Sequence, residues 1–300
     1  MIVRIDGTNQ ATDTLQQCIR DAMETHGKSA ALHVRTSLAM TPEELSRLFN
    51  SLETDFGYEG GNTPRRQLSG AVVSATELPP EFPISAHNEL SYGRTWPTRV
   101  YFGCENPPNS GGETYLVSGE SLLSQLPKAI RLAFVEKNLV YMRTLHSGHG
   151  LGRSWQETYQ TENANELSAR LRSEGSDFSW HEDYLTVRQK GPAVLDDPTK
   201  NGSVWFNQAE QWHPSSLPLD VHEVLLETLG DERKFPQYAE FGDGTEIPNE
   251  WLEEIRSLAL SLAEPVQWSA GDLLIFDNRV HLHGRYAFTG QRRVHAALAV

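Results

Sequence analysis

Short apolar runs, separated by turns rich in glycine, proline and asparagine, recur along most of the chain. Runs of this length that contain many β-branched and aromatic residues are typical of strands. The predicted strands are 71–75, 98–104, 139–143, 184–189, 203–206, 272–276 and 293–300. The pattern therefore indicates a fold that is mainly β.

Helical periodicity interrupts these runs, and the predicted helices are 121–138, 165–174, 219–230 and 249–263. Residues 1–55 are also predicted to be mainly helical, and TPEELSRLFNSL (41–52) is the clearest segment. Thr41 can cap the start of this helix, Pro42 suits its first turn, and Glu44 can reach back to complete a capping box.

The predicted strands and helices do not alternate regularly, so a doubly wound parallel sheet is not expected. A double-sheet jelly roll with helical insertions fits the order of elements better. No repeat or low-complexity segment divides the chain. Residues 1–300 are therefore predicted to form a single domain with a helical N-terminal region.

Charge and cysteine content narrow the class of protein. The formal net charge is −14, which would repel nucleic-acid phosphates and anionic membranes. Cys18 and Cys104 are too few for a disulfide framework or a cysteine zinc site, and they favour a reducing compartment. No apolar run reaches the ~20 residues of a membrane helix, and the N-terminus lacks the apolar core of a secretion signal. We expect a soluble cytoplasmic protein.

Candidate metal ligands stand out among the eleven histidines. In SAHNELSYGRTWP (85–97), His87 and Glu89 lie two positions apart, so a strand would aim both at one point. The segment GDLLIFDNRVHLHGR (271–285) offers His281 and His283 on another strand. Two histidines and one carboxylate form the facial triad that binds Fe(II). Spacing alone leaves open which of the two histidines takes part, and whether zinc is the metal instead.

An arginine pair, Arg292 and Arg293, follows on the predicted terminal strand. A guanidinium group can bind a carboxylate through two parallel hydrogen bonds. In a site open to a bidentate acid, the far carboxylate of 2-oxoglutarate would be held in this way. The alternative is that both arginines are surface charges on an edge strand.

Ten motifs run in order through residues 55–300. They are NTPRR (62–66), HNELSY (87–92), WPTRVYFGC (96–104), GGET (111–114), YMR (141–143), LGRSWQETYQT (151–161), VWFNQAEQWHPSSL (204–217), FGDGTEI (241–247), GDLLIFDNRVHLHGR (271–285) and FTGQRR (288–293). Together they resemble the taurine-dioxygenase-like (TauD/TfdA) superfamily of Fe(II)/2-oxoglutarate oxygenases. Within it, the SyrP-like hydroxylases of nonribosomal-peptide and antibiotic biosynthesis are the most similar branch. Any one motif alone would not be specific.

The resemblance implies a double-stranded β-helix (jelly-roll) core and assigns Fe(II) to His87, Glu89 and His283. The implied cofactors are Fe(II), 2-oxoglutarate and O₂, with succinate and CO₂ as co-products. Related halogenases lose the carboxylate ligand so that chloride can take its place. The presence of Glu89 therefore argues against halogenation.

The resemblance also implies a co-substrate site. Thr114 of the GGET motif would hydrogen-bond 2-oxoglutarate, and an arginine of the pair would hold its far carboxylate. The pattern of the SyrP-like branch favours Arg292, whereas the taurine dioxygenase pattern favours Arg293. Ala296 or Ala297 stands where taurine dioxygenase has a second arginine that grips the sulfonate, so a sulfonate substrate is disfavoured.

The implied reaction is hydroxylation of an amino acid or an amino-acid-derived intermediate in secondary-metabolite biosynthesis. Epoxidation and desaturation by the same ligands stay open, as does a non-catalytic metabolite-binding jelly roll. A zinc hydrolase is a third alternative. Because carrier proteins are generally acidic, a chain of charge −14 favours a free small-molecule substrate over a carrier-tethered one. The oligomeric state is left open.

Candidate substrate contacts flank the metal motif. They come from the loop before the first core strand, from the residues just after Glu89, and from the YMR and WFNQ segments. The candidates are Thr63, Arg65, Ser91, Tyr92, Arg143 and Asn207. Asn207 would present an amide to a polar substrate. Arg143, on a predicted strand, either contacts the substrate or forms a structural ion pair, because an unpaired buried guanidinium is costly.

Overall fold

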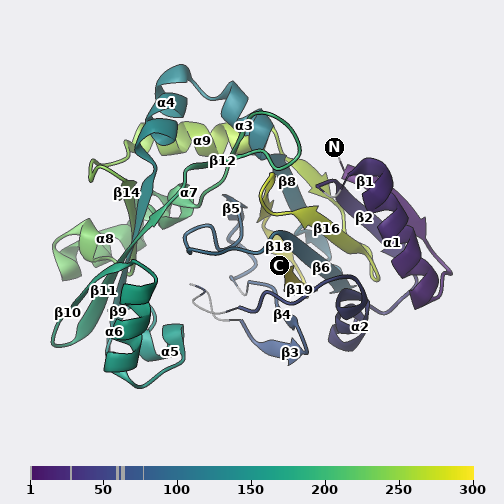
Figure 1. The fold of residues 1–300 in the computed structure, drawn as a ribbon, viewed down its shortest axis with the longest axis horizontal. Helices are drawn as coiled ribbons and strands as arrows, with labels where there is room; N and C mark the ends of the chain where they lie inside the picture. Colours follow the sequence, from purple (N-terminus) through teal and green to yellow (C-terminus); the bar gives the residue numbers. More distant parts are fainter. Residues whose placement is uncertain (1, 28, 59–60, 62–64, 77) are drawn as a thin grey trace.

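Two stacked β-sheets form the centre of the molecule in the computed structural model, which describes residues 2–27, 29–58, 61, 65–76 and 78–300. The larger sheet has the order β1 (Ile2–Gly7), β2 (Ala31–Thr36), β16 (Leu273–Asp277), β6 (Arg99–Asn106), β19 (Arg293–Ala299), β4 (Val72–Ser74) and β3 (Gln67–Ser69). The smaller sheet has the order β15 (Glu264–Val266), β8 (Thr114–Ser118), β17 (His281–Arg285) and β5 (Ile84–His87). Figure 1 shows α1 (Thr12–His26) and α2 (Pro42–Leu52) beside the larger sheet.

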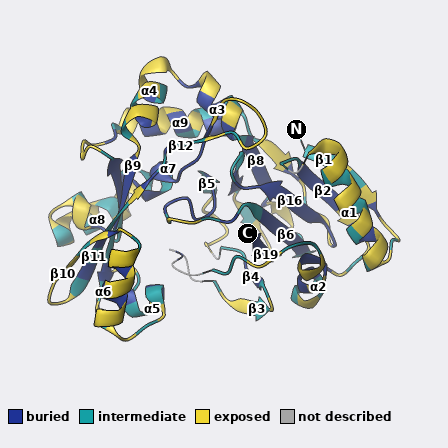
Figure 2. Ribbon diagram, in the orientation of Figure 1, coloured by how far each residue is buried: buried dark blue, intermediate teal, exposed yellow. Residues whose placement is uncertain are grey.

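Alternation along the strands explains why the two sheets stack. In β6, Val100 and Phe102 belong to the main apolar cluster, which also contains Leu116 of β8 and Leu282 of β17. Tyr101, between the first two, instead joins the cluster formed with α1 and α2. Because successive side chains point to opposite faces, one strand serves both layers. Figure 2 shows these strands buried and the outer face of α1 exposed.

Residues 119–263 form an insertion between β8 and β15, which are neighbours in the smaller sheet. Its helices are α3 (Gly119–Gln125), α4 (Lys128–Lys137), α5 (Trp155–Tyr159), α6 (Ala164–Ser173), α7 (Ala209–Trp212), α8 (Leu219–Leu229) and α9 (Asn249–Ser261), with 3-10 turns at Pro214–Ser216 and Glu232–Lys234. It also carries a sheet of order β10 (Asp177–Trp180), β11 (Tyr184–Gly191), β9 (Leu139–His146) and β14 (Gln237–Phe241). Two strand pairs complete the fold: β12 (Val194–Asp196) with β13 (Ser203–Trp205), and β7 (Ser110–Gly111) with β18 (Phe288–Thr289).

The predicted class, mainly β with a jelly-roll core and helical insertions, is confirmed, but the N-terminal prediction was only half right. Helices α1 and α2 form as expected, yet β1 and β2 flank α1 and pair in parallel. Strand β2 then pairs with β16, which lies more than 200 residues away. This long-range pairing, which local periodicity does not report, turns the segment into sheet.

The predicted cap of α2 is present. Thr41 Oγ1 accepts a hydrogen bond from the backbone N–H of Glu44 at 3.3 Å, with Pro42 in the first turn. The Glu44 carboxylate accepts from Thr12 Oγ1 at 2.9 Å, which joins the starts of α1 and α2. Within the described residues, no helix has the length and apolarity needed to cross a membrane.

Candidate metal centre

Adjacent strands bring the two metal-ligand motifs together. Strands β5 and β17 pair antiparallel, and His283 lies directly opposite His87 in the register. The spacing predicted that His87 and Glu89 share a strand. Strand β5 instead ends at His87, and Glu89 lies in the turn that follows. Leu90 has a left-handed backbone, with φ of 55°. Such a conformation is uncommon for a non-glycine residue, and it marks the sharp turn that directs Glu89 toward the histidines.

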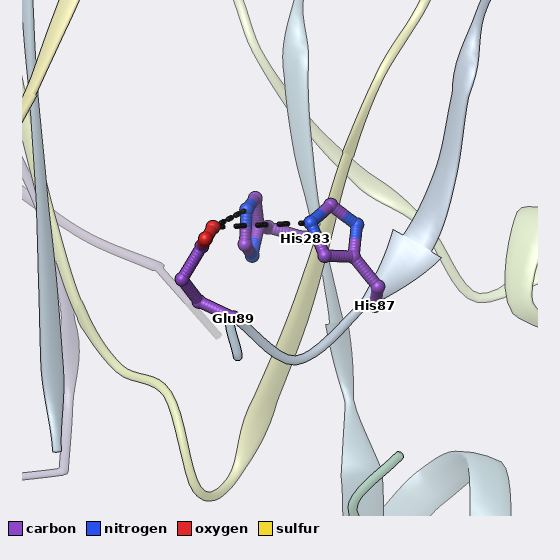
Figure 3. A group of neighbouring side chains, drawn as sticks. All are labelled: His87, Glu89 and His283. Carbon is purple, nitrogen blue, oxygen red and sulfur yellow. Dashed lines mark ion pairs between the residues drawn. The ribbon is translucent and has the colours of Figure 1, made fainter. Parts of the chain in front are cut away.

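The three side chains converge, as Figure 3 shows. Glu89 Oε2 lies 3.6 Å from His283 Nε2 and 3.9 Å from His87 Nε2. The two imidazole centroids are 4.2 Å apart. All three residues are buried, and Glu89 Oε2 has no hydrogen-bond partner among the described residues. A buried carboxylate oxygen facing two imidazole nitrogens is left unsatisfied unless a cation lies between them.

Arg65 binds the other oxygen of the same carboxylate. Its Nη2 lies 2.8 Å from Glu89 Oε1, and both side chains are buried. Burial alone would raise the pKa of Glu89, but the Arg65 guanidinium and then the two histidines hold it far below its usual range. Glu89 is therefore ionised at neutral pH, with one oxygen fixed and one available.

His87 is held as a neutral ligand. Burial, assisted by His283, lowers the pKa of His87 to about 3 although Glu89 acts in the opposite direction. His87 Nδ1 lies 2.9 Å from the Ser85 carbonyl, so a proton on Nδ1 leaves the lone pair on Nε2. Gln211 Nε2 donates to the same carbonyl at 3.0 Å. Partners of this kind fix the tautomer and the ring orientation of metal-binding histidines.

Two buried asparagines fix the backbone around Glu89. Asn278 Oδ1 accepts from the Glu89 N–H at 2.6 Å, and its Nδ2 donates to the carbonyls of Glu89 at 3.0 Å and Pro97 at 2.9 Å. Asn88 Nδ2 donates to the Asn278 carbonyl at 2.7 Å, and its Oδ1 accepts from the Asn207 N–H at 3.1 Å. The metal-ligand turn is thus hydrogen-bonded on both sides.

A cavity beside the triad contains the predicted co-substrate residues. His87, His283, Thr114 and Arg292 line it, together with Arg285. Thr114 Oγ1 accepts from Arg292 Nη2 at 3.3 Å, and Arg292 Nε donates to the Gly112 carbonyl at 3.0 Å. Burial and the neighbouring Arg285 lower the pKa of Arg292 to about 10. Two close guanidinium groups without a carboxylate partner among the described residues favour an anionic ligand.

The two members of the arginine pair point to different places. Arg292 lines the cavity, whereas Arg293 is exposed and lies 3.5 Å from Glu105 Oε1. Arg292 precedes β19, which begins at Arg293, so only the second arginine belongs to the strand. Arg293 is therefore not brought to the site.

Gly284 allows the site to form between β17 and β5. A Cβ at this position would lie 2.2 Å from Tyr115 Cζ and 2.6 Å from the Ile84 carbonyl oxygen. The Tyr115 ring crosses the glycine so that its hydroxyl donates to that carbonyl at 2.9 Å. Only glycine leaves room for this crossing next to His283.

The predicted substrate contacts have different outcomes. Tyr92 and Arg143 line a second cleft, and Ser91 is buried between Leu90 and Tyr92. Arg65 contacts Glu89, and Thr63 lies outside the described residues. Asn207 does not present a free amide, because its Nδ2 donates to the Ala193 carbonyl and its Oδ1 accepts from the Ala209 N–H.

Several residues of the site were missed by the sequence analysis. Arg285 of the HLHGR motif lines the cavity and donates to the carbonyls of Leu78, Pro79 and Phe82. Asn278 lies in the longer motif GDLLIFDNRVHLHGR (271–285), and its position beside a buried strand was the available signal. Gln211 had no signal in the local pattern, because its contact with Ser85 spans 126 positions.

Fe(II) fits this donor set. Two imidazole nitrogens and one carboxylate oxygen lie within 4.8 Å of one another, and all three residues are buried. The combination of two histidines and one carboxylate is typical of non-haem iron oxygenases. The unsatisfied Glu89 Oε2 supports the same conclusion.

Comparisons with known proteins give a consistent result. The model of the family "Taurine catabolism dioxygenase TauD, TfdA family" matches residues 3–298. The dapdiamide synthesis protein DdaC of Enterobacter agglomerans is 31% identical over 258 residues, which cover 85% of this chain and 78% of that protein. A clavaminate synthase-like protein of Arabidopsis thaliana is 31% identical over 268 residues, covering 83% and 76%.

Solved structures share the fold. An asparagine oxygenase in complex with Fe(II), 3-hydroxyasparagine and succinate superposes with a TM-score of 0.55 at 14% identity, covering 96% of this chain and 79% of that one. PvcB, an Fe, α-ketoglutarate-dependent oxygenase from an isonitrile synthetic pathway, gives a TM-score of 0.53 at 15% identity, covering 99% and 86%. The family match covers nearly the whole chain and the relatives most of it. This chain therefore belongs to the TauD/TfdA family and is an Fe(II)/2-oxoglutarate-dependent dioxygenase.

Proposed function

We propose that the enzyme hydroxylates an amino acid or a small amino-acid-derived molecule in secondary-metabolite biosynthesis, with His87, Glu89 and His283 as the iron ligands. The observation that carries the assignment is the buried Glu89 Oε2, which lacks a hydrogen-bond partner among the described residues and faces both Nε2 atoms. Fe(II) with 2-oxoglutarate and O₂ supplies the oxidising chemistry, and the co-substrate leaves as succinate and CO₂.

The protein keeps Glu89 ionised and holds the ligand side chains in position. Arg65 keeps Glu89 ionised and occupies one of its oxygens, so the other oxygen stays directed at the histidines. The ring centroids of Phe102 and Phe276 lie 5.4 Å and 5.2 Å from that of His283. These two rings form an apolar wall that keeps water away from their side of His283.

Arg292 and Thr114 are proposed to hold 2-oxoglutarate. The cavity is lined by three arginines, Arg65, Arg285 and Arg292. Only the first of these has a carboxylate partner among the described residues. A dicarboxylate supplies the missing negative charge, and the planar fork of Arg292 suits one of its carboxylate groups.

Three observations support hydroxylation of an amino-acid-like substrate. The carboxylate ligand is present as Glu89, which leaves chloride no position. DdaC, a relative at 31% identity, is named for dapdiamide synthesis. The asparagine oxygenase that shares the fold was solved with a hydroxylated amino acid.

The test is a product screen. Protein purified without O₂ is loaded with Fe(II) and 2-oxoglutarate and then offered a panel of amino acids and dipeptides in air. We expect one compound to gain a single oxygen atom, with an equal amount of succinate, and we expect His283→Ala to abolish both. Loss of two hydrogens would indicate desaturation, and oxygen gain at an alkene would indicate epoxidation. Tight binding without O₂ consumption, across the panel, would mean that the jelly roll only binds its metabolite.

A further inference from the structure

A second cleft is lined by the loop that follows Glu89. Its volume is about 420 Å³, within the range typical of small-molecule sites. Loop Leu90–Thr95, strands β9 and β11, and helix α6 contribute to its lining. No described residue lines both this cleft and the cavity beside the triad.

Arg143 of β9 lines this cleft and has no ion pair or hydrogen bond with the described part of the chain. Its guanidinium carbon lies 4.8 Å from the Tyr92 ring centroid and 5.4 Å from that of Trp212. Two aromatic rings thus fix the orientation of a half-buried cation. A guanidinium held by its face on aromatic rings leaves N–H donors at its edge for a planar acceptor.

Other buried or half-buried arginines differ from Arg143. Arg65 binds Glu89, and Arg256 binds Glu210 at 2.6 Å. Arg285 donates to several backbone carbonyls. Each of these has a partner that offsets the cost of burial, whereas Arg143 has no hydrogen-bond or ion-pair partner in the part of the chain that the structure describes. A ligand with a hydrogen-bond acceptor group would give the Arg143 guanidinium a partner.

The charge of the residues that line the cleft indicates the sign of the charge on that ligand. Among the described residues, three arginines and one glutamate, Glu174, line it, so the formal charge of this lining is positive in a chain of net charge −14. Glu174 is already paired with Arg170, with Nε–Oε1 at 2.9 Å. Burial raises the pKa of the Tyr141 and Tyr159 hydroxyls, so these phenols stay neutral and add no negative charge. An ammonium group is disfavoured because Arg143 already covers Tyr92 and Trp212.

Two chain segments connect the cleft with the metal centre. Glu89 is followed at once by Leu90, which lines the cleft, and Tyr92 lies two residues farther. On the other segment Gly57 lines the cleft, while the Tyr58 ring lies 4.5 Å from the Arg65 guanidinium that binds Glu89. A molecule anchored in the cleft therefore lies next to the elements that hold the ligand carboxylate.

We infer that this cleft binds the carboxylate of the primary substrate, with Arg143 as its anchor, so that the substrate is a free acid such as an amino acid or a small peptide. The inference rests on the proposed function, because it names the class of substrate for that site. Binding energy from a remote carboxylate orients the rest of the molecule toward the triad.

The test measures binding without turnover. Protein loaded with Fe(II) and 2-oxoglutarate under nitrogen is screened by thermal shift and calorimetry against amino acids and dipeptides, each paired with its own C-terminal primary amide. We expect at least one acid to bind and its amide to bind on the order of ten- to a hundred-fold more weakly. Arg143→Gln should weaken the binding of the acid by a similar factor. Arg143→Lys should recover part of the affinity, because it restores the charge without the fork.

Arg172→Gln is the matched control. Arg172 is an exposed arginine of α6 that stacks on an aromatic ring, Phe178 at 5.4 Å, but does not line the cleft. Its variant should bind the acid as the wild type does, and all variants should keep the wild-type affinity for 2-oxoglutarate. The inference is overturned if no acid of the panel binds, if acid and amide bind equally, or if Arg143→Gln binds the acid unchanged. An acid that binds through Arg143 but is not oxidised would contradict the proposed function and leave the anchor intact.

Discussion

Replacement of Asn278 by alanine should damage both the stability of the protein and its metal affinity. Asn278 is fully buried, and its side chain makes three hydrogen bonds, two to the backbone of Glu89 and one to that of Pro97. At about 1 kcal/mol for each bond, the loss is about 3 kcal/mol, and more where a buried backbone group stays unpaired. For a chain of this size the melting temperature should fall on the order of 5 to 10 °C.

The metal affinity should fall as well, because Asn278 positions Glu89 without touching the metal. Loss of such a supporting partner typically costs about 10- to 100-fold in affinity. Calorimetric titration of the metal-free protein with Co(II), alongside urea unfolding, measures both effects. Asn278→Asp keeps the acceptor for the Glu89 N–H but loses both donors, so it should be at least as damaging.

Asn163→Ala provides the control. Asn163 caps α6, and its Oδ1 accepts from the backbone N–H groups of Asn165 at 3.0 Å and Glu166 at 3.1 Å. Its loss should cost about 1 kcal/mol of stability and leave Co(II) affinity unchanged. The reasoning is refuted if Asn278→Ala binds Co(II) as tightly as the wild type, or if Asn163→Ala loses the same affinity.

Three further predictions concern the neighbouring residues. Without Arg65 the burial of Glu89 raises its pKa, so Co(II) binding by Arg65→Gln should be lost at a higher pH than in the wild type as the solution is acidified; identical pH profiles would contradict this. Arg292→Gln should raise the KM for 2-oxoglutarate by about 10- to 100-fold, whereas Arg293→Gln, at an exposed position, should leave it unchanged; the reverse pattern would contradict the assignment. Gly284→Ala should lower the free energy of unfolding by about 3 kcal/mol or more, because its Cβ meets the Tyr115 ring at 2.2 Å; near-wild-type urea unfolding would disprove the clash.

Much of the fold could be predicted because many strands and helices are locally patterned. The runs at 98–104 and 272–276 form β6 and β16, and the periodic segment 249–263 contains α9. Strands β1 and β2 were missed because their place depends on pairing with each other and with β16 across the chain. Sequence periodicity does not report such distant partners.

The residues of the site likewise divide into those that local sequence patterns indicate and those that depend on distant contacts. His87 and Glu89 could be proposed from spacing, although the turn at Leu90, rather than a shared strand, makes them converge. The choice of His283 over His281 depends on the register of β17 with β5 and on which histidine lines the cavity. The role of Asn207 was misjudged because its hydrogen bonds to Ala193 and Ala209 appear only in the folded chain.

The central claim is that His283, with His87 and Glu89, holds the catalytic iron, and His281 is a matched control on the same strand. His281 lies two residues away, half-buried, with Nδ1 at 3.3 Å from the Asp277 carbonyl. The direct measurement is the iron content of anaerobically loaded His283→Ala and His281→Ala, together with the succinate each forms. We predict that His283→Ala loses both bound Fe(II) and succinate formation, while His281→Ala keeps one Fe(II) per chain and forms succinate. Full iron content and turnover in His283→Ala would contradict the account.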